Sequence, residues 1–75
     1  MTEEVFSRAL EAFEAMPSEG TLERAVGSLV RGGVEISQVR NWARSNAQAY
    51  GIWPYVARTF DRMMTGAAKL AQSEG

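Results

Sequence analysis

Polar side chains suited to binding nucleic acid recur between residues 37 and 48. Arginine can donate two hydrogen bonds to guanine, asparagine and glutamine can pair with adenine, and serine can bond a phosphate. If this segment is helical, these side chains share its outer face, since residues three or four apart are neighbours. No carboxylate lies between Glu35 and Asp61 to repel a phosphate. The candidate nucleic-acid-binding residues are Ser37, Gln38, Arg40, Asn41, Arg44, Ser45 and Gln48.

Two helices joined by a glycine turn are expected to position this face. Apolar spacing predicts helices over about residues 21–31 and 37–50, and Thr21 and Ser37 are suited to be their N-caps. Gly33 can supply the positive φ of the turn, because glycine adopts it without strain. The side chains of Val34, Val39 and Trp42 are then expected to point inward and to pack the turn and the second helix against the core.

The stretch 33–44, Gly-Val-Glu-Ile-Ser-Gln-Val-Arg-Asn-Trp-Ala-Arg, resembles the recognition half of helix-turn-helix proteins in the phage-repressor and lambda-type activator class. The resemblance covers about 12 of 75 residues. It implies a steep crossing of the two helices, and a dimer that places the second helix of each copy in the major groove. The first helix departs from the pattern, since Leu29 stands where such motifs usually place alanine and Gly32 adds a second glycine to the turn.

Two more helices complete the predicted fold. Apolar spacing predicts them over about residues 2–16 and 53–71, with Pro54 in the first turn of the later one, where its missing N–H costs nothing. Seventy-five residues allow one domain. The fold class is therefore all-α: a single helical domain over residues 1–75, a small bundle of about four helices with a helix-turn-helix-like pair.

Several classes of function are excluded by residue types that the sequence lacks. It contains no cysteine and no histidine, so it offers no thiolate, no imidazole base and no ordinary zinc site. Its paired carboxylates fall on an exposed helix face without a pocket to shift their pKa values, so we expect no enzyme, metal or cofactor. No apolar run is long enough to span a membrane, and the acidic start is unlike a signal peptide, so we expect a cytoplasmic protein.

The polar face and the helix-turn-helix resemblance predict a small, dimeric DNA-binding transcriptional regulator. The uneven distribution of charge leaves a second function open. Residues 1–20 carry a net charge of −4, and residues 21–75 carry +3. A near-neutral total is unusual for a protein that binds double-stranded DNA by electrostatics alone. The alternative is a protein-interaction module, such as an adaptor, a chaperone-like subunit or a small phage-type inhibitor. It would meet its protein partner through the acidic helix 2–16 or the methionine-containing helix 53–71.

More apolar residues are present than a small monomer is expected to cover. Part of the apolar stripe on the first or last helix is therefore predicted to face a second copy, as in a two-fold homodimer. The candidate partner or dimer interface comprises Phe6, Leu10, Phe13, Val56, Phe60, Met63 and Met64.

Overall fold

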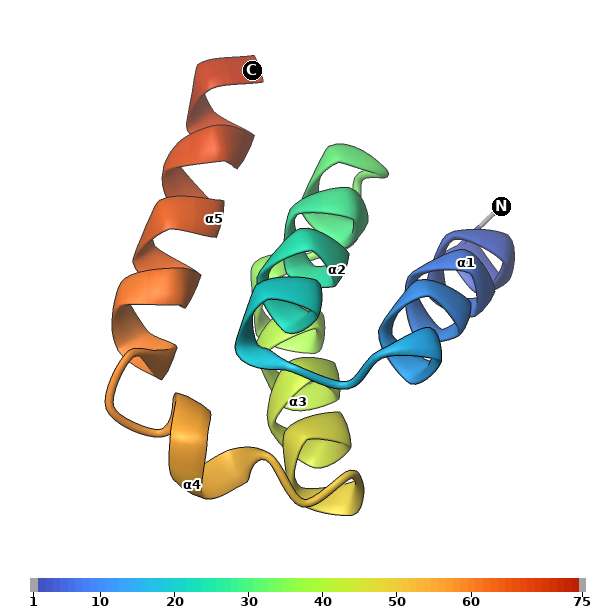
Figure 1. The fold of residues 1–75 in the computed structure, drawn as a ribbon. Coiled ribbons are helices and arrows are strands. Elements are labelled where there is room, and N and C mark those ends of the chain that lie inside the picture. Colours follow the sequence, from blue (N-terminus) through green and yellow to red (C-terminus); the bar gives the residue numbers. More distant parts are fainter. Residues whose placement is uncertain (1, 75) are drawn as a thin grey trace.

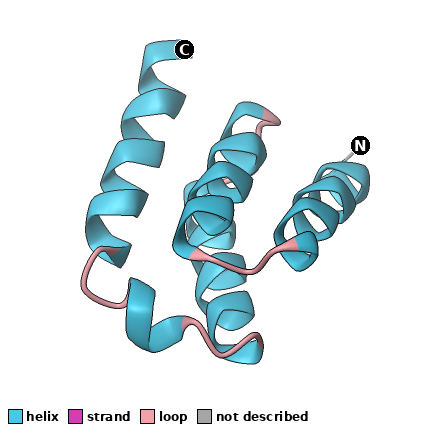
Figure 2. Ribbon diagram, in the orientation of Figure 1, coloured by secondary structure: helices cyan, strands magenta, loops and turns pink. Residues whose placement is uncertain are grey.

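The computed structural model describes residues 2–74, and every regular element among them is a helix (Figure 2). The predicted all-α bundle is therefore confirmed, with five helices in place of about four. They are α1 (Thr2–Ala15), α2 (Glu19–Arg31), α3 (Ile36–Ala49), α4 (Trp53–Val56) and α5 (Phe60–Glu74).

The predicted helix over 53–71 is wrong, because the chain breaks after Val56 into α4 and α5. Thr59 lies in the break, where its hydroxyl is hydrogen-bonded to the Val56 carbonyl at 3.3 Å and to the carboxylate of Glu19 on α2. On either side of the break, the Trp53 and Phe60 rings meet edge to face with centroids 5.2 Å apart. The break therefore turns α5 back so that it runs alongside α2 (Figure 1).

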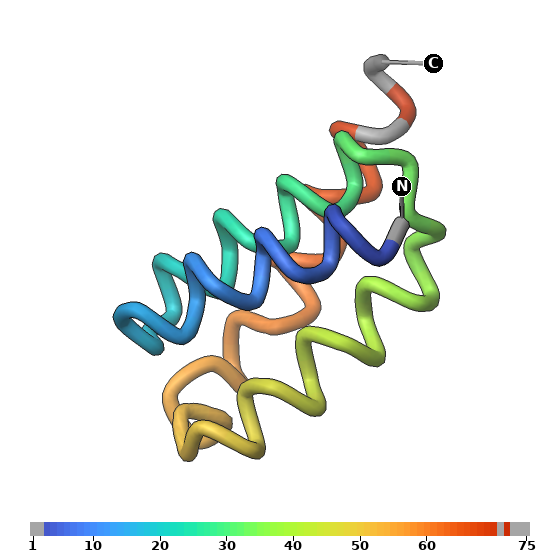
Figure 3. The backbone as a smooth tube through the Cα atoms, turned by 90° about the vertical axis from the view of Figure 1, so that its right-hand side faces the viewer, coloured from blue at the N-terminus to red at the C-terminus, as the bar shows by residue number. Residues whose placement is uncertain are grey.

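Helix α2 lies at the centre of the bundle and contacts α1, α3 and α5. Helices α2 and α3 run in nearly opposite directions in both views, whereas α2 and α5 run the same way (Figures 1 and 3). The largest fully buried side chains come from four of the five helices, so one core joins them. These side chains are Phe13, Leu22, Val26, Leu29, Val39 and Val56.

A reciprocal cap places the start of α2 earlier than the sequence predicts. Ser18 is the N-cap: its Oγ accepts a hydrogen bond from the Thr21 backbone N–H at 3.2 Å, and the Ser18 N–H donates to Thr21 Oγ1 at 3.0 Å. The Thr21 hydroxyl also donates to the Met16 carbonyl at 2.7 Å. The prediction of Thr21 as the N-cap is wrong, because its side chain can reach back to satisfy the chain entering the helix.

Replacing Ser18 with alanine is expected to lower the free energy of unfolding by about 1 kcal/mol, since the Thr21 backbone N–H loses its Ser18 Oγ acceptor. Urea denaturation followed by circular dichroism measures this change. Ser18→Asp keeps an acceptor at the same position and serves as the control, with a much smaller loss. Equal losses in the two variants would contradict a capping role.

The turn between α2 and α3 has the predicted glycine geometry. Gly33 has φ +87°, and the N–H groups of Gly33 and Val34 donate to the carbonyls of Val30 and Leu29, both at 3.0 Å. Val34 is buried as predicted. Helix α3 begins at Ile36 with Glu35 as its N-cap, so the prediction that Ser37 caps it is wrong. The Ser37 hydroxyl donates instead to the Glu35 carboxylate at 2.9 Å.

Candidate nucleic-acid interface on helix α3

Helix α3 separates an apolar from a polar face along its whole length. Val39, Ala43 and Ala47 recur every fourth residue and are buried against the bundle. The opposite side is exposed to solvent, and α3 lies at the outside of the molecule in the turned view (Figure 3). All seven residues predicted to bind nucleic acid are exposed. We call five of them the α3 polar face: Ser37, Gln38, Asn41, Ser45 and Gln48.

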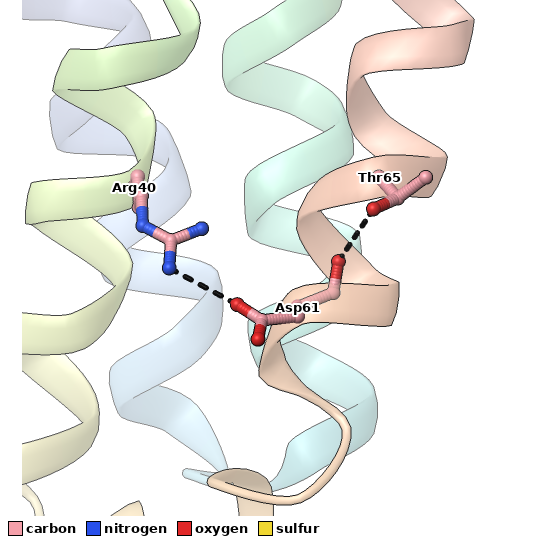
Figure 4. Close-up of polar contacts among 3 residues, drawn as sticks. All are labelled: Arg40, Asp61 and Thr65. Carbon is pink, nitrogen blue, oxygen red and sulfur yellow. Dashed lines mark hydrogen bonds and ion pairs between the residues drawn. The ribbon is translucent and has the colours of Figure 1, made fainter.

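Arg40 points from the flank of this face toward α5. Its guanidinium lies 3.0 Å from a carboxylate oxygen of Asp61 (Figure 4). It also lies 5.1 Å from the centroid of the Phe60 ring. Asp61 is further connected within α5, since its carbonyl accepts a hydrogen bond from Thr65 at 2.8 Å (Figure 4). Arg40 thus links α3 to α5. The Asp61 carboxylate partly offsets the positive charge that Arg40 could offer to an anion such as a phosphate.

Arg44 has a similar role one turn later, toward α4. Its guanidinium lies 5.4 Å from the centroid of the Trp53 ring, within the range of a cation–π contact. Arg58 is exposed on the segment that follows α4. The arginines therefore border the polar face on its α4–α5 side, and neither Arg40 nor Arg44 lies at its centre.

One carboxylate lies at the start of the α3 polar face, and another lies beside Tyr50, just after the end of α3. Glu35 accepts the hydrogen bond from Ser37 at the start of α3, so a phosphate there would meet a negative charge. Near the end of α3, Tyr50 packs edge to face on Phe13 of α1, with ring centroids 5.2 Å apart. Desolvation is the main cause that raises the pKa of the Tyr50 phenol, and the nearby Glu14 carboxylate adds to it.

The steep crossing of α2 and α3 expected from the helix-turn-helix resemblance is not what the structure has. The two helices form an antiparallel hairpin (Figures 1 and 3). Small Ala43 and Ala47 continue the buried stripe of α3 to its end. Trp42 adds contacts with α1, since its ring centroid lies 6.4 Å from that of Phe6 and 6.5 Å from that of Phe13.

Most of the residues predicted to form a partner or dimer interface belong to the core of the chain itself. Only Phe6 and Leu10 are partly exposed. That interface prediction is wrong for the remaining five, because Phe13 is buried against Trp42 and Tyr50, and the break between α4 and α5 folds the last apolar stripe onto the bundle. The five buried residues are Phe13, Val56, Phe60, Met63 and Met64.

Within the described part of the chain there is no cluster of three or more potential metal-ligating side chains. No helix in residues 2–74 is long and apolar enough to cross a membrane. Comparison with models of protein families, with curated proteins and with solved structures finds no match to this chain.

Proposed function

We propose that this protein is a small regulator that binds double-stranded DNA through the α3 polar face. The observation that carries the proposal is that this face is exposed along its length and has no carboxylate of its own. A major groove about 12 Å wide admits one α-helix. An outer helix on an antiparallel hairpin can enter it without the steep crossing of a helix-turn-helix.

Amide side chains would supply the base contacts. Asn41 and Gln48 lie two turns apart on the polar face, and each can bond adenine through both its carbonyl and its amino group. Arg44 and Arg58 would contact phosphates on the α4 side of the groove. With about two or three phosphates contacted, the logarithm of the affinity should fall with the logarithm of salt concentration with a slope of about −2 to −3.

Replacing Gln48 with glutamate tests the proposal with almost no change in side-chain shape. The expected result is about tenfold weaker binding or more, since a base contact is lost and a carboxylate faces the phosphates. Fluorescence anisotropy of a labelled mixed-sequence duplex, measured from low to physiological salt, gives the affinity.

Gln72→Glu is the matched control, because Gln72 is an exposed residue near the end of α5, away from the end of α3. It introduces the same charge and should leave binding nearly unchanged. Equal weakening by both variants would show that only total charge matters. Absence of binding by the unaltered protein at low salt would overturn the proposal.

A protein-interaction module is the second candidate, favoured by apolar exposure where α1 meets α3. Met16 is 68% exposed and follows Phe13 by one turn, and the Tyr50 ring that contacts Phe13 is 38% exposed. Exposed Glu11 and Glu14 make the neighbouring surface acidic. If DNA binding fails, capture of a protein partner that is lost with Met16→Ser would support this candidate.

A further inference from the structure

An open groove of about 1000 Å³ runs between α2 and α5. Gly20, Gly27 and Arg31 line it from α2, on the side of that helix opposite the buried Leu22 and Leu29. Because the core and α3 pack on the leucine side, the groove opens on a different face of the molecule from the α3 polar face. On the α5 side, Met63 and Ala67 are buried at the base of the groove, and Leu70 is half-buried.

Four charged residues of α2 line this groove, namely Glu19, Glu23, Arg24 and Arg31, and two of them lie on one stripe of the helix with Gly27. Glu23, Gly27 and Arg31 are spaced by four residues, so they form one stripe along the helix. A carboxylate lies one turn before the glycine, and a guanidinium lies one turn after it. A two-fold rotation about an axis through Gly27 exchanges the two ends, so the stripe is complementary to itself.

We propose that a second copy of this chain docks in the groove, with the α2 helices of the two copies antiparallel and crossing at Gly27. Each Glu23 then meets Arg31 of the partner subunit, giving two equivalent ion pairs. The same surface serves in both copies, as a two-fold dimer requires. Leu70, which is half-buried in the single chain, would be covered at the same time.

Gly27 suits a close crossing of two helices, because it places no side chain between them. A Cβ added there would have Arg31 Nη1 as its nearest neighbour, at 4.0 Å. The arginine therefore lies over Gly27 in the single chain and must swing aside to reach a carboxylate of the partner. Arg31 is exposed, so this movement disturbs no core packing.

This pairing is independent of DNA binding. It uses α2 and α5 and leaves the α3 polar face of each copy exposed on the outer sides of the pair. Dimerisation can therefore fail while DNA binding succeeds, and the reverse also holds.

Charge reversal tests the pairing by sedimentation velocity over a range of protein concentrations. Glu23→Arg and Arg31→Glu should each weaken self-association by about tenfold or more, because like charges then face each other across the axis. An equimolar mixture of the two variants should associate again, since both ion pairs are restored in the heterodimer. The double variant E23R/R31E should also associate with itself.

Three controls keep the result interpretable. Glu11→Arg on α1 and Lys69→Glu on α5 make the same charge changes outside the residues that line the groove and should leave association unchanged. Gly27→Ala places a Cβ in the crossing and should weaken association while the helical circular dichroism is retained, since in the single chain that Cβ makes only an ordinary contact with Arg31 at 4.0 Å.

Two outcomes would overturn the proposal. One is a monomer at every concentration up to about 1 mM, which corresponds to the weak end of measurable affinity. The other is association that the single reversals do not weaken or that their mixture does not restore, which would place a different surface or a different occupant at the interface.

Discussion

Replacing Phe13 with alanine is expected to lower the free energy of unfolding by about 3–5 kcal/mol. Phe13 is 0% exposed and is one of the largest fully buried side chains. Its ring meets Trp42 and Tyr50 edge to face, with centroids 6.5 and 5.2 Å away. Its loss would leave a cavity between α1 and α3 and remove both aromatic contacts.

A domain of this size has a total stability of about 4–11 kcal/mol, so the alanine variant is expected to be partly or largely unfolded at 37 °C. Phe13→Leu keeps most of the volume and gives a measurable intermediate loss. Phe6→Ala removes the same ring from a half-buried site on the same helix and should cost clearly less. Urea denaturation followed by tryptophan fluorescence compares the three variants. A loss no greater than that of Phe6→Ala would contradict the central place of Phe13 in the core.

Replacing Gly32 with alanine is expected to destabilise the protein by about 1–3 kcal/mol, although alanine is the better helix former. A Cβ built on Gly32 would lie 2.8 Å from Val5 Cγ1 and 3.3 Å from the Ser28 carbonyl oxygen. The φ of Gly32 is −77°, which any residue can adopt. The cost therefore arises from contact with α1 and not from backbone strain.

A double-mutant cycle with Val5→Ala distinguishes these two causes. Removing the Val5 methyl groups should recover most of the loss in Gly32→Ala, because the close contact disappears. The matched control is Gly33→Ala, which is strained by its φ of +87° but has no atom within 4 Å of the added Cβ. Val5→Ala should not rescue that variant. Absence of coupling between positions 5 and 32 in thermal denaturation would show that α1 does not pack on this turn as described.

The sequence by itself determined the helical class, the glycine turn and the exposed side of α3. Apolar residues at helical spacing specified most of each helix, and Gly33 indicated the positive φ that the structure has. The seven polar residues chosen from spacing alone are all exposed. These features depend on residues within one or two helical turns of each other, so a local pattern is enough to predict them.

Only the tertiary structure decided which elements pack together and in which direction. Asp61 reaches Arg40 from 21 residues away, and Thr59 reaches Glu19 from 40 residues away. The same long-range packing breaks the last predicted helix and buries Phe60, Met63 and Met64, which the sequence pattern had left available to a partner. An apolar stripe specifies that a face must be covered, but its spacing contains no information about which surface covers it. That choice depends on how the whole chain fills its core.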